Sequence, residues 1–205
     1  MMADTAQHPY LVPADPSWPR AAARVITDLA AATDWPIERF QHIGSTAIPD
    51  MPAKPVLDVQ AQVPDLDGLG AQSRQRLSEL GYQRSDEVTG DHVPVWISPR
   101  GVAGDHSGAT TGWRKRLWIR REPGPAVNCH IRLAGAANAR LALLFRDWMR
   151  AHPQESMAYG QFKERLAGLS DDVASYSDTK DPVVDMVAAT AARWARDVGW
   201  TPPAQ

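Results

Sequence analysis

The spacing of apolar residues predicts helices at both ends of the chain. In the first, over 20–32, apolar residues recur three and four positions apart. Ser17 is suited to cap this helix and Pro19 to stand in its first turn. A shorter helix is predicted over 68–80, ended by Gly81. Three further helical segments close the chain: 138–151, 154–168 and one from about Asp181-Pro182 to 199.

Alternation of apolar and polar residues predicts the strands between these helices. The clearest case is 55–63 (PVLDVQAQV), because its side chains divide into two faces. One face is Leu57, Val59, Ala61 and Val63, and the other is Val56, Asp58, Gln60 and Gln62. Other strands are predicted at 37–43, at 92–97 and in a hairpin of 113–121 with 126–133.

This order of elements predicts one α+β domain over 1–205. We expect a mixed β-sheet backed by helices, with a helical C-terminal layer over 138–199. Residues 1–16 are rich in proline and are expected to form an irregular N-terminal arm. The segment 98–112 is rich in glycine and is expected to be a long exposed loop or lid.

Composition narrows the class of protein. Of the 205 residues 43% are hydrophobic, which is enough for a core, and the net charge of −2 argues against bulk nucleic-acid binding. The single cysteine, Cys129, excludes an intramolecular disulfide and favours a reducing compartment. No signal peptide or membrane-spanning run is apparent, so we expect a cytoplasmic protein without a membrane partner. The oligomeric state is left open.

The tripeptide Gly44-Ser45-Thr46 is the first candidate for chemistry. A glycine after a strand lets backbone N–H groups approach an anion, and the two hydroxyls add hydrogen-bond donors. The alternative is a tight turn in which one hydroxyl caps a short helix.

Asp58 is the second candidate, because a carboxylate is unfavourable inside a strand. It could be a metal ligand, a general base or half of an ion pair. A Gly-Ser turn followed by strand carboxylates at i and i+2 is typical of nucleotidyltransferases, whose two carboxylates bind Mg²⁺. Here position i+2 is Gln60, so half of the usual metal-binding charge is missing.

His130 shares a strand face with Arg132, and a central sheet could bring that strand beside Asp58. An Asp–His pair could act as a general base or hold a divalent metal, with Mg²⁺ or Mn²⁺ as the candidates. A buried histidine bonded to backbone is the alternative, and His42 presents the same choice.

Two arginine-rich segments remain. Within 113–121 (WRKRLWIRR), one strand face carries Arg114, Arg116, Trp118 and Arg120. This face could bind phosphate or carboxylate groups, or it could belong to a solvated edge strand. The segment 145–150 (FRDWMR) is expected to form ion pairs on a helix surface or between layers.

These segments together resemble the GrpB family, which also occurs as the C-terminal domain of some dephospho-coenzyme A kinases. The matching stretches are DPSWP (15–19), HIGSTAIP (42–49), AKPVLDVQ (53–60), LGY (80–82), CHIRLAG (129–135), LLFRDWMRAHP (143–153), YGQFKERLA (159–167) and YSDTKD (176–181). The resemblance implies a nucleotidyltransferase-like fold with one strand carboxylate, matched by Asp58, and a histidine matched by His130. Gln41 and Asp50 depart from the family's usual Glu and Gly.

Two main functions follow as hypotheses. In an enzyme that transfers a nucleotidyl or phosphoryl group to a small molecule, Asp58 and His130 would be catalytic or bind metal. The groups that would bind phosphate or neutralise charge are Gly44, Ser45, Thr46, Lys54, Arg116 and Arg132.

The alternative is a non-catalytic domain that binds a nucleotide or metabolite or assists folding of a partner. A third hypothesis is chemistry with one metal or none, using Asp58 and His130 as acid and base. Any of the site hypotheses requires Asp58 and His130 to lie within about 5–6 Å of each other, or to share a pocket with Ser45.

Overall fold

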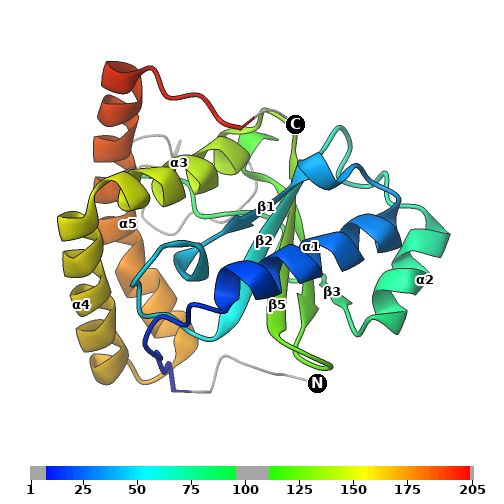
Figure 1. The fold of residues 1–205 in the computed structure, drawn as a ribbon, viewed down its shortest axis with the longest axis horizontal. Helices are drawn as coiled ribbons and strands as arrows, with labels where there is room; N and C mark the ends of the chain where they lie inside the picture. The colour runs from blue at the N-terminus through cyan, green and yellow to red at the C-terminus, as the bar shows by residue number, and fades with distance from the viewer. Residues whose placement is uncertain (1–7, 96–110, 204–205) are drawn as a thin grey trace.

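A computed structural model describes residues 8–95 and 111–203, which fold around a five-stranded mixed sheet (Figure 1). The strands are β1 (Phe40–Ile43), β2 (Val56–Val63), β3 (Gln83–Ser85), β4 (Lys115–Arg120) and β5 (Ala126–Leu133). Their order in the sheet is β1-β2-β5-β4-β3, with β2 and β5 parallel and the other neighbours antiparallel. The predicted hairpin is therefore confirmed as β4 and β5.

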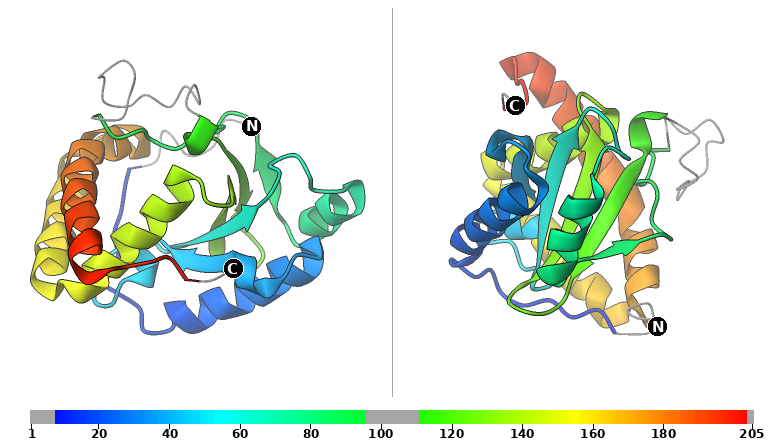
Figure 2. Two further views of the ribbon diagram at one scale, coloured as in Figure 1. Left: turned by 90° about the horizontal axis from the view of Figure 1, so that it is seen from above. Right: turned by 90° about the vertical axis from the view of Figure 1, so that its right-hand side faces the viewer.

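Helices cover both faces of this sheet. They are α1 (Trp18–Thr33), α2 (Ala71–Glu79), α3 (Ala137–Ala151), α4 (Pro153–Leu169) and α5 (Val173–Val198). Helices α3, α4 and α5 gather at one end of the sheet, on the left of Figure 1, and α2 lies at the other end. Figure 2 shows α1 on one side of the sheet and α5 on the other. The expected α+β class, with a mixed sheet and a helical C-terminal layer, is confirmed.

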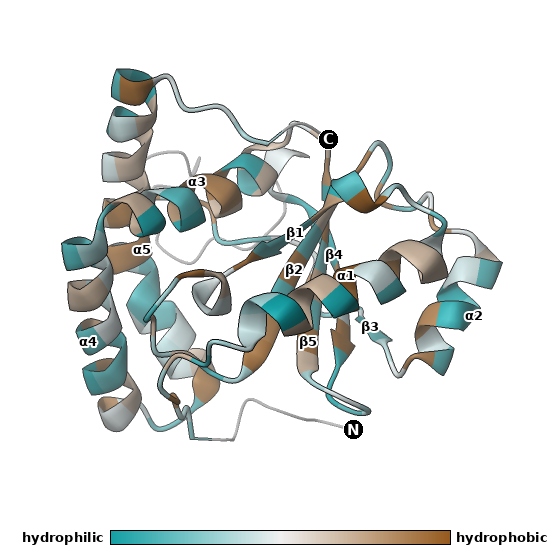
Figure 3. Ribbon diagram, in the orientation of Figure 1, coloured by the Kyte–Doolittle hydropathy of each residue, from teal (hydrophilic) through white to brown (hydrophobic). Residues whose placement is uncertain are grey.

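The larger core lies between α1 and the apolar face of the sheet. Figure 3 shows hydrophobic and hydrophilic residues alternating along the central strands, as the sequence pattern predicted. The apolar residues of β2 pack in one buried cluster with Val25 and Leu29 of α1 and with Val127 of β5. Burying a side chain such as Leu29 contributes roughly 1.5–3 kcal/mol, so this face fixes which side of β2 is polar.

A second cluster holds the C-terminal helices together and anchors the loop that follows β1. Ile48 and Met51 of that loop pack against Leu144 and Trp148 of α3, together with residues of α4 and α5. The loop is therefore part of the helical layer rather than a free connection.

Several predicted boundaries moved. Residues 37–39 form a 3₁₀ turn, so β1 is shorter than predicted. The predicted strand at 92–97 is wrong for residues 92–95, which pair with no strand. The Val95 N–H donates instead to Asp185 Oδ2 of α5. The rest of that strand and 98–110 lie outside the described residues, and positions 111–112 begin a 3₁₀ turn.

Helix ends explain two further differences. Helix α5 begins at Val173 rather than near Pro182, because the Asp172 side chain caps it by accepting from Ser175 N–H. Ser17 makes no capping bond; its own N–H donates to Asp15.

The end of α2 agrees with the sequence, since Gly81 follows it with φ +85°. Within 8–95 and 111–203, no helix has the length and the apolar character that crossing a bilayer requires.

Candidate functional site

The face of the sheet opposite the larger core is polar and borders a cavity. Parallel pairing of β2 with β5 aligns Asp58 with Asn128 and Gln60 with His130. A cavity of about 320 Å³ lies over this face, walled by the turn after β1 and by residues of α3 and α5. Its lining includes Gly44, Ser45, Asp58, His130, Arg132 and Lys180. Three separate segments that the sequence singled out therefore meet in one place.

Asp58 is held by β5. Its Oδ1 accepts hydrogen bonds from Asn128 Nδ2 at 3.0 Å and from His130 Nε2 at 3.3 Å. Burial opposes ionisation, but the bonds from His130 and Asn128 and the charge of Lys54 outweigh it and lower the Asp58 pKa below its usual value. The predicted proximity of Asp58 and His130 is confirmed. Their catalytic and metal-binding roles stay predictions.

His130 is neutral at pH 7. Burial, with the nearby charge of Lys115, lowers its pKa from 6.5 to about 4, although Asp58 opposes this shift. A neutral ring that donates from Nε2 to the ionised Asp58 carries a lone pair on Nδ1. Nδ1 is buried and has no hydrogen-bond partner among the described residues. That lone pair is therefore unpaired but shielded from the cavity.

The Gly-Ser-Thr turn fits against Asp58 through its glycine. Gly44 has φ +70°, and a Cβ there would stand 2.5 Å from Asp58 Oδ2. Ser45 lines the cavity, whereas Thr46 is buried and its Oγ1 hydrogen-bonds His42 Nε2 at 2.9 Å. Of the two predicted hydroxyl donors, the structure brings only Ser45 to the cavity.

Side chains from α3 hold this turn in place. Arg146 donates to the His42 carbonyl at 3.0 Å, and Arg150 donates twice to the Ala47 carbonyl at 2.9 and 2.7 Å. The expected ion pair of Arg146 with Asp147 is also present, at 2.7 Å. Arg146 and Arg150 therefore position the loop and also form ion pairs with Asp147.

Lys163 of α4 is a residue that the sequence reasoning missed. Its Nζ lies 2.9 Å from Ser45 Oγ and 2.6 Å from the Pro52 carbonyl oxygen. The available signal was its place in YGQFKERLA (159–167), one of the stretches that carried the family resemblance.

Arg132 lines the cavity, but its charge is already paired. Its Nε and Nη2 contact the carboxylate of Asp91 at 2.8 and 3.0 Å, and Nη1 donates to Gln60 Oε1. Lys115 also bonds Asp91, at 2.6 Å. Burial opposes ionisation of Asp91, but these two cations hold its pKa well below the usual range.

Gln60 is completely buried and does not line the cavity. Its amide nitrogen donates to Gln41 Oε1 and to the Ala139 carbonyl, and its oxygen accepts from Arg132. Gln60 therefore links β1, β5 and α3. Its amide oxygen bonds Arg132 and is not directed at a metal site.

Arg116 is not brought to this site. Leu117 is the residue of β4 that pairs with His130, and alternation therefore places Arg116 on the opposite face of the sheet. There it forms a bidentate ion pair with Asp67. Lys115 takes the position facing the site, so the predicted role of Arg116 is corrected.

Lys54 precedes β2 and does not line the cavity, although its charge acts on Asp58. Its Nζ lies 6.0 Å from the ring centroid of Tyr176.

Helix α5 supplies Lys180 and Asp181 to the cavity, and His92 Nε2 hydrogen-bonds Asp185 at 2.7 Å. Burial lowers the pKa of Lys180, against the charges of Asp181 and Asp58.

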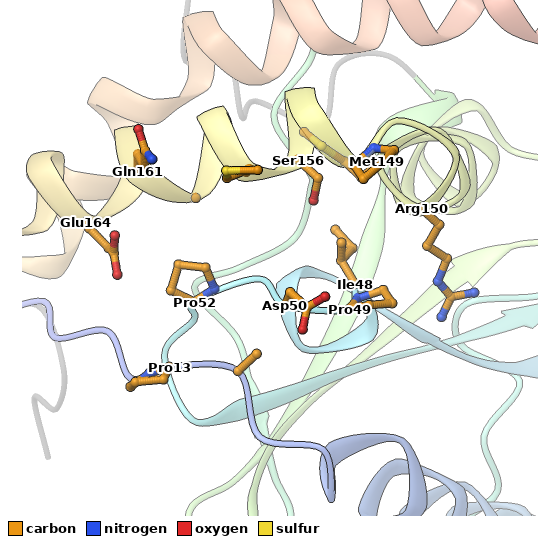
Figure 4. A pocket seen from close by; sticks show the side chains of 14 residues that line it. Pro13, Ile48, Pro49, Asp50, Pro52, Met149, Arg150, Ser156, Gln161 and Glu164 are labelled. Carbon is orange, nitrogen blue, oxygen red and sulfur yellow. The ribbon is translucent and has the colours of Figure 1, made fainter.

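A larger cavity of about 530 Å³ lies behind the loop (Figure 4). Figure 4 shows α4 on one side of it and the segment with Pro49, Asp50 and Pro52 on the other, with Pro13 nearby. None of the residues predicted for chemistry lines it, so the smaller cavity is the candidate site.

The side chains at the candidate site are poorly suited to hold a resident metal ion. Within 8–95 and 111–203 no group of three or more His, Cys, Asp or Glu side chains is arranged to hold a metal ion. Asp58 and His130 bond each other, and Mg²⁺ prefers six oxygen ligands. Neither Mg²⁺ nor Mn²⁺ is assigned to this pair.

Comparison with known proteins adds relatives of this chain. Residues 8–190 match the family model described as GrpB protein. A dephospho-CoA kinase of Mycobacterium tuberculosis is 36% identical over 198 residues, covering 94% of this chain and 48% of that protein. A UPF0157 protein of Pseudomonas aeruginosa is 29% identical over 188 residues, covering 88% of this chain and 66% of that protein.

A solved structure shares the fold. The crystal structure of conserved protein GrpB from Enterococcus faecalis has a TM-score of 0.64 and 18% identity, over 91% of this chain and 99% of that one. The chain spans about half the length of the dephospho-CoA kinases it matches.

Proposed function

The chain belongs to the GrpB family, and from that premise we propose that its cavity binds a nucleotide or another small molecule carrying phosphate. The observation that carries this proposal is the meeting of Ser45, Asp58, His130 and Lys180 in one cavity. A hydroxyl and a lysine ammonium are suited to phosphate oxygens.

The rest of the lining suits the non-phosphate part of such a ligand. Apolar side chains of α3 and α5, among them Leu141, Phe145 and Val184, form one wall of the cavity. A volume of about 320 Å³ is at the lower end for small-molecule sites. These features favour a ligand the size of a mononucleotide over a long polyphosphate.

Two-metal nucleotidyl transfer receives less support. That chemistry needs carboxylates that hold two cations about 3.5–4 Å apart. Gln60 occupies the second position and all its polar atoms are hydrogen-bonded inside the protein. The alternative stated from the sequence, a non-catalytic domain that binds a nucleotide or metabolite, needs no second carboxylate and is compatible with this arrangement.

A nucleotidyl or phosphoryl transferase is the second candidate, favoured by the hydrogen bond between neutral His130 and ionised Asp58. Asp58, the more exposed member of the pair, could accept and return a proton during transfer to a hydroxyl. The matched dephospho-CoA kinases make dephospho-CoA and ATP natural probes. These relatives also favour keeping the folding-accessory role as a candidate, because the chain matches only about half the length of each kinase.

Thermal unfolding with AMP, ATP or dephospho-CoA, each with EDTA, Mg²⁺ or Mn²⁺, tests the proposal. Ligand at about 100 times its Kd should stabilise the fold by about 2.7 kcal/mol, which raises Tm by roughly 5–10 °C for a domain of this size. Lys180→Met should remove the shift. Arg116→Met is the matched control, because Arg116 lies on the opposite face.

The outcome also separates the candidates. Stabilisation in EDTA that survives Asp58→Asn supports binding without metal. Stabilisation only with metal, lost in Asp58→Asn, supports the transferase. Absence of any shift with all three probes, or equal loss in Arg116→Met, contradicts phosphate binding in this cavity. A higher refolding yield of a dephospho-CoA kinase domain in the presence of this chain would favour the accessory role.

A further inference from the structure

Helix α4 carries a buried amine to a hydroxyl that borders the cavity. Lys163 is only 2% exposed, and its Nζ lies 2.9 Å from Ser45 Oγ. Nζ also donates to the Pro52 carbonyl at 2.6 Å. Ser45 itself is partly exposed and lines the cavity. Among residues 8–95 and 111–203 no carboxylate forms an ion pair with this amine, and the serine beside it is accessible, so a role beyond loop anchoring is open to the pair.

We propose that Ser45 and Lys163 are a nucleophile and its general base, through which Ser45 Oγ attacks a phosphorus atom of a phosphoanhydride bound in the cavity. A serine hydroxyl is a weak nucleophile until an adjacent base takes its proton. Serine–lysine pairs fill that role on unrelated folds. The nature of the electrophile rests on the proposed function above, whereas the reactivity of Ser45 does not.

The surroundings of Lys163 favour the neutral amine that a base requires. Burial lowers its pKa from 10.5 to about 7, the charges of Lys180 and Lys54 add to this, and Glu164 and Asp58 oppose it. The ring of Tyr159, whose centroid lies 5.5 Å from Nζ, acts in the opposite direction, because an aromatic face attracts an ammonium. A neutral amine can donate to the Pro52 carbonyl and direct its lone pair to the Ser45 O–H.

The step balances without a metal or redox partner. The Ser45 O–H bond breaks and its proton passes to the lone pair of Lys163. An Oγ–P bond forms while the P–O bond to the leaving phosphate breaks, and the leaving oxygen departs as an anion with the electron pair. Water or an acceptor alcohol then attacks the phosphorus and its proton passes to solvent, while the Oγ–P bond breaks and protonated Lys163 returns its proton to Ser45 Oγ.

A phosphorus electrophile is favoured by the cations near the turn. Lys54 and Lys180 both interact electrostatically with Asp58, so they lie around the same point. Negative charge on the equatorial oxygens of a transferring phosphoryl group is stabilised by such cations. Lys180 also lines the cavity with Ser45.

A tagged alkyl fluorophosphonate tests the pair directly, because it phosphonylates activated serines without needing a nucleotide site. We expect labelling at Ser45, located by peptide mass spectrometry, with a rate that rises as pH increases through about 7. Ser45→Ala should abolish labelling, and Lys163→Met should slow it by about 100-fold or more. Ser175→Ala is the control, since Ser175 is an exposed serine of α5.

Wild-type protein alone can refute the pair, so the result does not depend on the Lys163 variant folding. No labelling of Ser45, or labelling with no change between pH 6 and pH 8, overturns the pair and leaves Lys163 as a loop anchor. Incubation with ATP should also add a phosphoryl or adenylyl mass to Ser45. If the fluorophosphonate labels Ser45 but no nucleotide raises Tm, the reactivity of Ser45 is supported. The assignment of a phosphoanhydride as its electrophile is then overturned.

Discussion

Gly44→Ala is the substitution most sensitive to the geometry of the site. Gly44 has φ +70° and ψ −171°, a backbone conformation that is essentially restricted to glycine and costs other residues roughly 1–3 kcal/mol. The new methyl carbon would also stand 2.5 Å from Asp58 Oδ2 and 2.9 Å from Asp58 Cβ. Asp58 lies in the middle of β2 and cannot retreat as a free side chain would, so the turn or the carboxylate must shift.

The expected loss of stability follows from these two contributions. Displacing Asp58 weakens its bonds to Asn128 and His130, and disrupting such bonds costs about 1–3 kcal/mol. Together with the backbone strain we expect Gly44→Ala to lower the free energy of unfolding by about 2–6 kcal/mol. Urea denaturation followed by the fluorescence of the eight tryptophans measures it.

Gly168→Ala is the matched control. Gly168 lies near the end of α4, and nothing stands within 4 Å of a Cβ placed there. Replacing a helical glycine with alanine in open space should stabilise the protein by up to about 1 kcal/mol. If Gly44→Ala costs less than about 0.5 kcal/mol, the close packing of the turn against Asp58 is refuted.

Three more predictions address other parts of the site. The folded His130 pKa of about 4 lies below the unfolded 6.5, so stability should fall as pH drops from 6.5 to 4, by up to about 3 kcal/mol. Burial also lowers the His42 pKa to about 4, so His130→Gln should reduce the slope of a chemical-denaturation pH series without abolishing it. Arg150→Met should cost about 1.5–3 kcal/mol in urea melts through its lost bonds to the Ala47 carbonyl, and no change would refute that anchor. Arg116→Met should leave ligand-induced thermal shifts intact and lower stability by at most about 1 kcal/mol, because its Asp67 pair is exposed; loss of the shift would show that the face assignment is wrong.

Local pattern was sufficient for most elements, and particular residues show where it failed. The alternation in 55–63 predicted both faces of β2 correctly, and Gly81 marked the end of α2. Pro182 suggested a helix start, yet the cap at Asp172 opens α5 earlier. The short strand β3 was missed, because three polar residues at a sheet edge carry no apolar pattern.

The candidate site depended more on long-range structure. Asp58 and His130 were selected from residue type and motif, but only the parallel pairing of β2 with β5 makes them neighbours. Arg116 was chosen from the same strand that supplies Lys115, and the pairing of Leu117 with His130 reversed their roles. Lys163 was invisible as a partner of Ser45, because it lies on a helix far along the chain.

The sequence by itself determined the helices, the strand faces, the family and the residue types available for chemistry, since each is encoded in neighbouring positions. The tertiary structure decided which strand lies beside β2, which helices cover the polar face, and which amine reaches the turn hydroxyl. Those choices depend on packing between distant segments, and a periodic pattern specifies the face that a residue occupies without specifying what will stand opposite it.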